Sequence, residues 1–171
     1  MSLFITEICP LDFAKQKECI QKQKRGKRLD ELDKKLLNLL QKNGRLSIKK
    51  LSEALFITAP AVSQRLKHLE ETRHLVDYQA TVDYEQAGLP IKAFIHLSIE
   101  PQQKASFYPF IQAIPNVLEC DCVTGPYSML IKVVFPSTKA LDHFINDLQK
   151  FGRTNTQIVF STPVPSRGFQ F

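Results

Sequence analysis

The sequence predicts an α+β protein in which a small helical domain precedes a sheet domain. Residues 29–76 contain three successive segments whose apolar residues recur every three or four positions, the spacing of amphipathic helices. Residues 92–162 then read as strand, helix, strand, strand, helix, strand. This βαββαβ order is the ferredoxin-like arrangement.

The first helix is marked at both ends by residues suited to helix termini. Leucines recur at helical spacing from Leu29 to Leu40. Asp30 is the expected N-cap, because its carboxylate can accept hydrogen bonds from the free N–H groups of the first turn. The pair Asn43-Gly44 ends the pattern.

The second and third helices are predicted to form a helix-turn-helix. Ser47 and Thr58 are their expected N-caps, and Pro60 falls in the first turn of the third helix, where a missing N–H is harmless. Only residues 56–58 link the two helices. Two short amphipathic helices joined by so few residues favour this motif, although any three-helix bundle contains similar hairpins.

The outer face of the third helix favours DNA as the partner. At about 100° per residue, the side chains that point away from the apolar stripe include no acid: Pro60, Ser63, Gln64, Lys67 and His68. Small, amide and cationic groups are those that read base edges and bind phosphates.

The remaining chain is predicted to alternate between strands and helices. Strands are expected over 77–83, 93–100, 117–124, 129–135 and 154–161, and helices over 106–114 and 137–151. Pro109 would occupy the third position of its helix, where it is tolerated. Gly88-Leu-Pro90 marks a domain boundary, and Gly125-Pro126-Tyr127-Ser128 is expected to be a hairpin turn.

Charge is distributed unevenly along the chain. The net charge is +6, and the first 29 residues carry seven Lys/Arg against three Asp/Glu, whereas residues 81–171 carry seven of each. The basic arm, residues 1–28, either follows DNA phosphates or is a solvated tail. The absence of a spanning apolar run or signal peptide leads us to expect a cytoplasmic protein without membrane contact.

Other function classes find little support in the sequence. Cys120 and Cys122 share one face of a strand and His96 lies on another strand, so a metal site is conceivable, but the spacing is not that of C-x-x-C sites. Cysteines lining a buried sheet face are the commoner case. With no P-loop, Rossmann or nucleophile-elbow motif, we expect neither an enzyme nor a cofactor. A ligand-sensing or protein-interaction module without a specific DNA target is the alternative.

Several strings, in this order and spacing, resemble the Lrp/AsnC (feast/famine) family of transcription regulators. They are Leu29-Asp-Glu-Leu-Asp33, Leu36-Leu-Asn-Leu-Leu-Gln-Lys-Asn-Gly-Arg45, Leu51-Ser52, Ala61-Val-Ser-Gln-Arg-Leu-Lys-His-Leu-Glu70, Tyr78 and Val123-Thr-Gly125. The resemblance covers residues 29 to about 162. It implies a winged helix-turn-helix over 29–76, a hinge strand and linker over 77–91 and a RAM domain over 92–162, followed by a tail over 163–171. It also implies a homodimer, a higher even-numbered oligomer and a small-molecule effector.

These predictions assign a role to each candidate residue at the double-stranded DNA. Ser63 and Gln64 would reach base edges, and Ala59 and Pro60 a thymine methyl group. The phosphate contacts would come from Ser47, Thr58, Arg65 and Lys67, although Arg65 lies at the edge of the apolar stripe and can instead cover the core. A RAM dimer would place two such helices on roughly palindromic half-sites about one helical turn apart.

Two departures from the family pattern lead to specific expectations. The family usually has Gly where this chain has Phe56, and because a positive φ is unfavourable for Phe, we expect a different turn here, such as a continuous helical corner. The candidate effector contacts are Thr124, Gly125, Pro126, Tyr127 and Ser128, where the family usually has two acids. Without them, only Glu119 or Asp121 could pair with an ammonium group, so we expect weak or no amino-acid binding.

Overall fold

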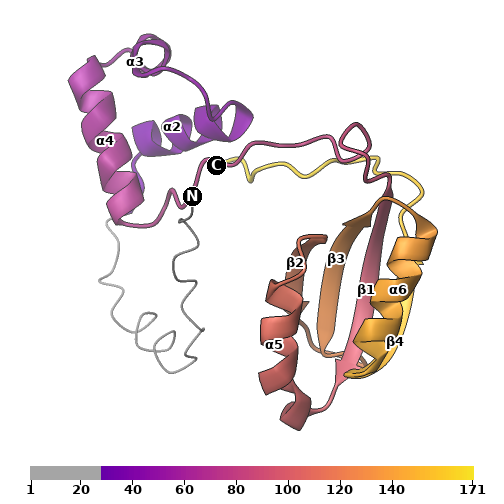
Figure 1. The fold of residues 1–171 in the computed structure, drawn as a ribbon. Helices are drawn as coiled ribbons and strands as arrows, with labels where there is room; N and C mark the ends of the chain where they lie inside the picture. Colours follow the sequence, from indigo (N-terminus) through magenta and orange to yellow (C-terminus); the bar gives the residue numbers. More distant parts are fainter. Residues whose placement is uncertain (1–27) are drawn as a thin grey trace, which may run out of the picture. The chain divides into compact units, whose positions relative to one another are not determined.

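The computed structural model describes residues 28–171, and the basic arm apart from Arg28 lies outside them. The chain divides into two compact units. One comprises the residues up to Gln79 together with Arg167–Phe171, and the other comprises Ala80–Ser166. Figure 1 shows the three helices of the first unit and the sheet with its two helices in the second.

The first unit contains three helices in the predicted places, α2 (Glu31–Lys42), α3 (Ile48–Leu55) and α4 (Ala59–Glu71). All three predicted N-caps are confirmed. The Asp30 carboxylate accepts from the Asp33 N–H and the Asp33 carboxylate from the Asp30 N–H, while Ser47 and Thr58 cap α3 and α4. The apolar stripes of α2, α3 and α4 meet in a core whose most buried members are Leu36, Leu51, Val62 and Leu69.

The turn between α3 and α4 contradicts the expectation of a helical corner. Phe56 itself adopts the left-handed conformation, with φ 55° and ψ 40°, and ends α3 as its C-cap. Its N–H donates to the carbonyl of Ser52, as a left-handed cap requires. For a residue with a Cβ this conformation costs roughly 1–2 kcal/mol. The remaining contacts of the turn therefore offset this cost and hold Phe56 in a conformation usually adopted by glycine.

The strand predicted over residues 77–83 is absent. An extended segment becomes a strand only when another strand pairs with its N–H and C=O groups, and among residues 28–171 this segment has no such partner. Its first part is instead held to the helical unit: the Tyr78 hydroxyl donates to the Glu70 carboxylate over 3.0 Å.

The second unit confirms the predicted ferredoxin-like order. Its elements are β1 (Ile91–Ile99), the short 3-10 turn η1 (Pro101–Gln103), α5 (Lys104–Gln112), β2 (Val117–Cys122), β3 (Met129–Phe135), α6 (Thr138–Gln149) and β4 (Gly152–Ile158). The strands form one antiparallel sheet in the order β2-β3-β1-β4. Both helices lie on the same side of this sheet (Figure 1).

The two faces of the sheet differ in burial. Ala93, Ile95 and Leu97 of β1 are fully buried, as are Ile131 and Val133 of β3, and these residues form one core with α5 and α6. On the opposite face, Val134 is buried, whereas the following side chains are half-buried and are not covered by a helix: Lys92, Phe94, His96, Leu130 and Lys132. The sheet therefore presents a partly apolar surface away from its helices.

Two details of this unit depend on contacts within it. η1 begins the helical run earlier than predicted, so Pro109 lies inside α5 rather than in its first turn. Gly152 opens β4 directly beside β1, where a Cβ would overlap the carbonyl oxygen of Ser98. Only glycine allows the two backbones to approach so closely.

None of the helices found between residues 28 and 171 is both long and apolar enough to cross a membrane.

Candidate nucleic-acid interface

The N-termini of α3 and α4 both carry capping hydroxyls that retain a free hydrogen. The Ser47 Oγ accepts from the Lys50 N–H over 3.3 Å, and the Thr58 Oγ1 accepts from the Ala61 N–H over 3.4 Å. Since each cap uses an oxygen lone pair, the hydroxyl hydrogen can still donate to a phosphate oxygen. The helix dipole adds positive potential at the same places.

The outer face of α4 is exposed, as the helical periodicity predicted. Ala59, Pro60, Ser63, Gln64 and Lys67 are all exposed. The Ser63 hydroxyl donates to the Ala59 carbonyl over 3.1 Å, so it remains available only as an acceptor. The side chain of Gln64 makes no hydrogen bond within the described part of the chain, which leaves its amide free for the two-point contact that adenine accepts.

Lys67 is only loosely engaged. Its ammonium lies 3.8 Å from the Glu71 carboxylate, and both side chains are largely exposed. Such a pair contributes little and is easily exchanged for a phosphate. Lys67 therefore presents a cation next to Gln64 and one turn along from Ser63.

Arg65 differs from these residues because its guanidinium is held inside the unit. Its Nη1 lies 2.6 Å from an Asp30 oxygen and 2.6 Å from an Asp33 oxygen. The two carboxylates raise the pKa of Arg65 further, and the pKa of Asp30 is lowered by the Asp33 N–H and by Arg65. Arg65, which was predicted to contact a phosphate, thus clamps α4 to the start of α2 in this structure.

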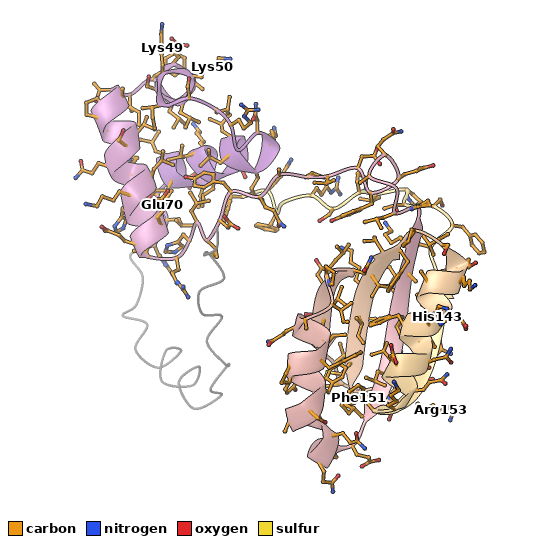
Figure 2. The ribbon with its side chains drawn as sticks, in the orientation of Figure 1. Lys49, Lys50, Glu70, His143, Phe151 and Arg153 are labelled. Atoms are coloured by element: carbon orange, nitrogen blue, oxygen red, sulfur yellow. The ribbon has the colours of Figure 1, made fainter. Side chains whose placement is uncertain are left out.

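Two cations were missed by the sequence analysis. Lys49 and Lys50 occupy the first turn of α3, are exposed and project outward from it (Figure 2). Cations are unfavourable at a helix N-terminus, and neither lysine has an ion-pair partner among residues 28–171. Two lysines in the first turn of a helix, where the helix dipole disfavours cations, were the sequence signal that could have identified these residues.

The candidate effector residues form the turn between β2 and β3, but Ser128 is already engaged. Its N–H donates to the Leu97 carbonyl over 3.0 Å, and its Oγ accepts from the Ile99 N–H over 3.0 Å. Thr124, Gly125 and Pro126 are exposed, and the Tyr127 ring lies 5.3 Å from that of His96. Of the two nearby carboxylates, that of Glu119 pairs with Lys132 over 3.1 Å.

The cysteine pair of β2 offers no metal site. Cys120 and Cys122 lie opposite Ile131 and Met129, so both are on the helix-covered side of the sheet, but Cys122 is exposed rather than buried as expected. Cys120 is half-buried and packs against the core, and burial raises the pKa of its thiol to about 11. Across residues 28–171 no group of His, Cys, Asp and Glu is arranged to hold a metal ion.

A helix-turn-helix with an acid-free outer face, followed by a ferredoxin-like domain, defines a two-domain DNA-binding regulator. Comparison with known proteins agrees for both domains. Residues 29–70 match the model of the AsnC-type helix-turn-helix domain, and residues 92–169 match that of the Lrp/AsnC ligand-binding domain.

Curated relatives and solved structures give the same result. The chain is 36% identical over 132 residues to the HTH-type transcriptional regulator LrpA of Bacillus subtilis, covering 77% of this chain and 97% of that protein. It superposes on the structure of B. subtilis LrpC with a TM-score of 0.78 at 26% identity, covering 82% of this chain and all of that one. A Neisseria meningitidis transcriptional regulator solved with L-Met gives a TM-score of 0.77 at 29% identity, covering 81% and 94%.

The chain therefore belongs to the Lrp/AsnC family of transcriptional regulators. This confirms the predicted fold class, DNA-binding regulation as the function and the expectation that the chain is not an enzyme.

Proposed function

We propose that α4 enters the major groove of duplex DNA and reads a specific site through Gln64 and Ser63. Gln64 offers a donor and an acceptor to adenine, while Ser63 accepts from a base amino group. Ala59 and Pro60 contact a thymine methyl group. The observation that carries this proposal is the exposed face of α4, which has no acid between Ala59 and Lys67.

The phosphate contacts in this proposal come from both helix N-termini. Ser47 and Thr58 donate through their free hydroxyl hydrogens, and Lys49, Lys50 and Lys67 neutralise phosphates. Arg65 is a positioning residue that holds α4 against α2. Residues 29–76 then form the DNA-binding domain, residues 77–91 the hinge, residues 92–162 the oligomerisation and effector domain, and residues 163–171 the tail.

The test begins with selection of preferred sites from random duplexes by the full-length chain. Gln64→Ala should cost about 1–3 kcal/mol on the selected site and relax one base position. Lys67→Ala should weaken all duplexes alike and reduce the salt slope by about 0.9. Lys139→Ala, an exposed cation on α6, is the control. If Gln64→Ala binds the selected site as the unchanged chain does, the assignment of the reading face is wrong.

We propose further that the uncovered sheet face forms a homodimer. Phe94 and Leu130 lie there, and the Tyr127 ring lies against His96 of the same face, so a second copy of this face would bury them. Light scattering of the full-length chain at micromolar concentration should give at least a dimer, and Phe94→Asp should reduce its mass. Gln103→Asp, in η1, should not. A monomeric unchanged chain would contradict the proposal.

The effector proposal is that common amino acids bind weakly or not at all. The Ser128 hydroxyl already bonds to β1 and the Glu119 carboxylate pairs with Lys132, so of the two carboxylates on β2 only that of Asp121 is left to pair with an ammonium group. The relative solved with L-Met makes methionine the first amino acid to test. Thermal shift of the full chain against all twenty amino acids should show no binding in the micromolar range. Micromolar binding that is lost in Tyr127→Ala would overturn this proposal.

A further inference from the structure

Phe56 combines two features that are each unfavourable for the isolated helical unit. Its backbone is left-handed, with φ 55° and ψ 40°, a conformation in which a bulky side chain is an outlier. Its side chain is 94% exposed, so the ring gains almost nothing from packing within the unit. Glycine would satisfy the same cap without either penalty.

A strained residue whose surroundings impose its conformation points to a role outside the fold. The cap hydrogen bond to Ser52 involves only backbone atoms, so it does not require a phenyl ring. The ring of Phe56 is therefore not explained by the stability of this unit.

The position of Phe56 indicates where the ring acts. It lies three residues before Ala59, and three residues span at most about 11 Å of chain. Ala59 and Pro60 at the start of α4 are exposed and uncharged, as is Thr58 before them. Phe56 is thus close in the chain to the exposed, uncharged start of the helix proposed to enter the groove.

We infer that Phe56 is a further specificity-determining residue, whose ring packs against the 5-methyl group of a thymine at the edge of the site read by α4. This inference rests on the proposed function. The base edges in the major groove display hydrogen-bond donors and acceptors together with one apolar group, the thymine methyl. Phenylalanine is among the side chains that contact this methyl group. The contact is uncharged, so it contributes to sequence preference without altering the number of phosphates neutralised.

The experiment compares Phe56→Gly with the unchanged full-length chain on a site selected from random duplexes. Phe56→Gly should raise the melting temperature by about 5 °C, because the cap strain is removed. It should nevertheless weaken binding to the selected site about fourfold or more, the equivalent of about 0.8 kcal/mol for one buried methyl group. The salt slope should stay unchanged. Phe56→Asn, which tolerates the left-handed cap but lacks the ring, should weaken binding equally.

The decisive arm replaces each thymine of the selected site by deoxyuridine, one at a time. At one position the loss of the methyl group should weaken binding by the unchanged chain about fourfold and leave Phe56→Gly unaffected. Phe160→Ala, which removes a fully exposed ring from the other unit, is the control and should behave as the unchanged chain.

The possible failures are distinguishable. If no site is selected, or if Gln64→Ala leaves binding intact, the proposed function fails. If Gln64→Ala loses binding while Phe56→Gly retains it, or if deoxyuridine affects both chains equally at every position, only the inference about Phe56 is overturned.

Discussion

Replacing Arg65 by methionine should destabilise the helical unit far more than removing an ordinary surface cation. Methionine keeps the aliphatic stem over the core but removes the guanidinium that binds Asp30 and Asp33, each over 2.6 Å. The Asp33 side chain is only 12% exposed, and without Arg65 its carboxylate keeps a single longer hydrogen bond from the Asp30 N–H. A nearly buried carboxylate would then lack its cation.

The size of the effect follows from the burial of the two pairs. Asp30 is half exposed, so its pair with Arg65 contributes at most about 1 kcal/mol. A hydrogen bond to a charged and nearly buried partner such as Asp33 is worth about 1.5–3 kcal/mol. Together these give a loss of about 2–3 kcal/mol, equivalent to a fall of roughly 10–20 °C in the melting temperature of so small a unit.

The assay is hydrogen exchange of the full-length chain, read separately for peptides of the helical unit and of the sheet unit, together with thermal unfolding. Lys34→Met is the matched control, because it removes an exposed ion pair between Lys34 and Glu31, both on α2. This change should cost under about 1 kcal/mol. Arg65→Lys should restore part of the loss, since a lysine cannot bridge both carboxylates as a guanidinium does. Equal effects of Arg65→Met and Lys34→Met would refute the clamp.

The same cluster should respond to acid in a defined direction. Because the Asp33 N–H and Arg65 hold the pKa of Asp30 below its ordinary value of 3.8, its contribution is complete above that value and is lost as the pH falls through the lowered pKa. Arg65→Met should flatten this acid dependence in part, since the Asp33 N–H remains.

Three further outcomes are expected. Gly152→Ala should destabilise the sheet unit by about 2 kcal/mol or more, because a Cβ would overlap the backbone of β1, and urea unfolding that matches the unchanged chain would contradict this. Burial and a hydrogen bond to Glu70 raise the pKa of Tyr78 from 10.0 to about 12, so Tyr78→Phe should lose about 0.5–1 kcal/mol in urea unfolding at pH 8, and this loss should shrink as the pH rises above 10. In an iodoacetamide pulse at pH 8 followed by peptide mapping, exposed Cys122 should react well before Cys120, whose thiol has a pKa of about 11; equal rates would show that Cys120 is not shielded.

Much of this protein was determined by signals that act within a few residues of chain. The caps at Asp30, Ser47 and Thr58 all form as predicted, because each involves a side chain and an N–H three positions away. The periodicity of α4 likewise predicted which of its residues are exposed, since 3.6 residues per turn is a property of the backbone itself. The order of strands and helices followed from patterns of the same short range.

Tertiary structure decided the features that depend on a partner distant in sequence. Residues 77–83 have a strand pattern, but no strand within residues 28–171 pairs with them. The sequence allowed Arg65 either to contact a phosphate or to cover the core, and the fold places the carboxylates of Asp30 and Asp33 against it. The left-handed turn at Phe56 was likewise imposed by the packing of α3 against α4, which outweighs the local preference of the residue. Local propensities differ by about 1 kcal/mol, and the packing of whole helices exceeds that easily.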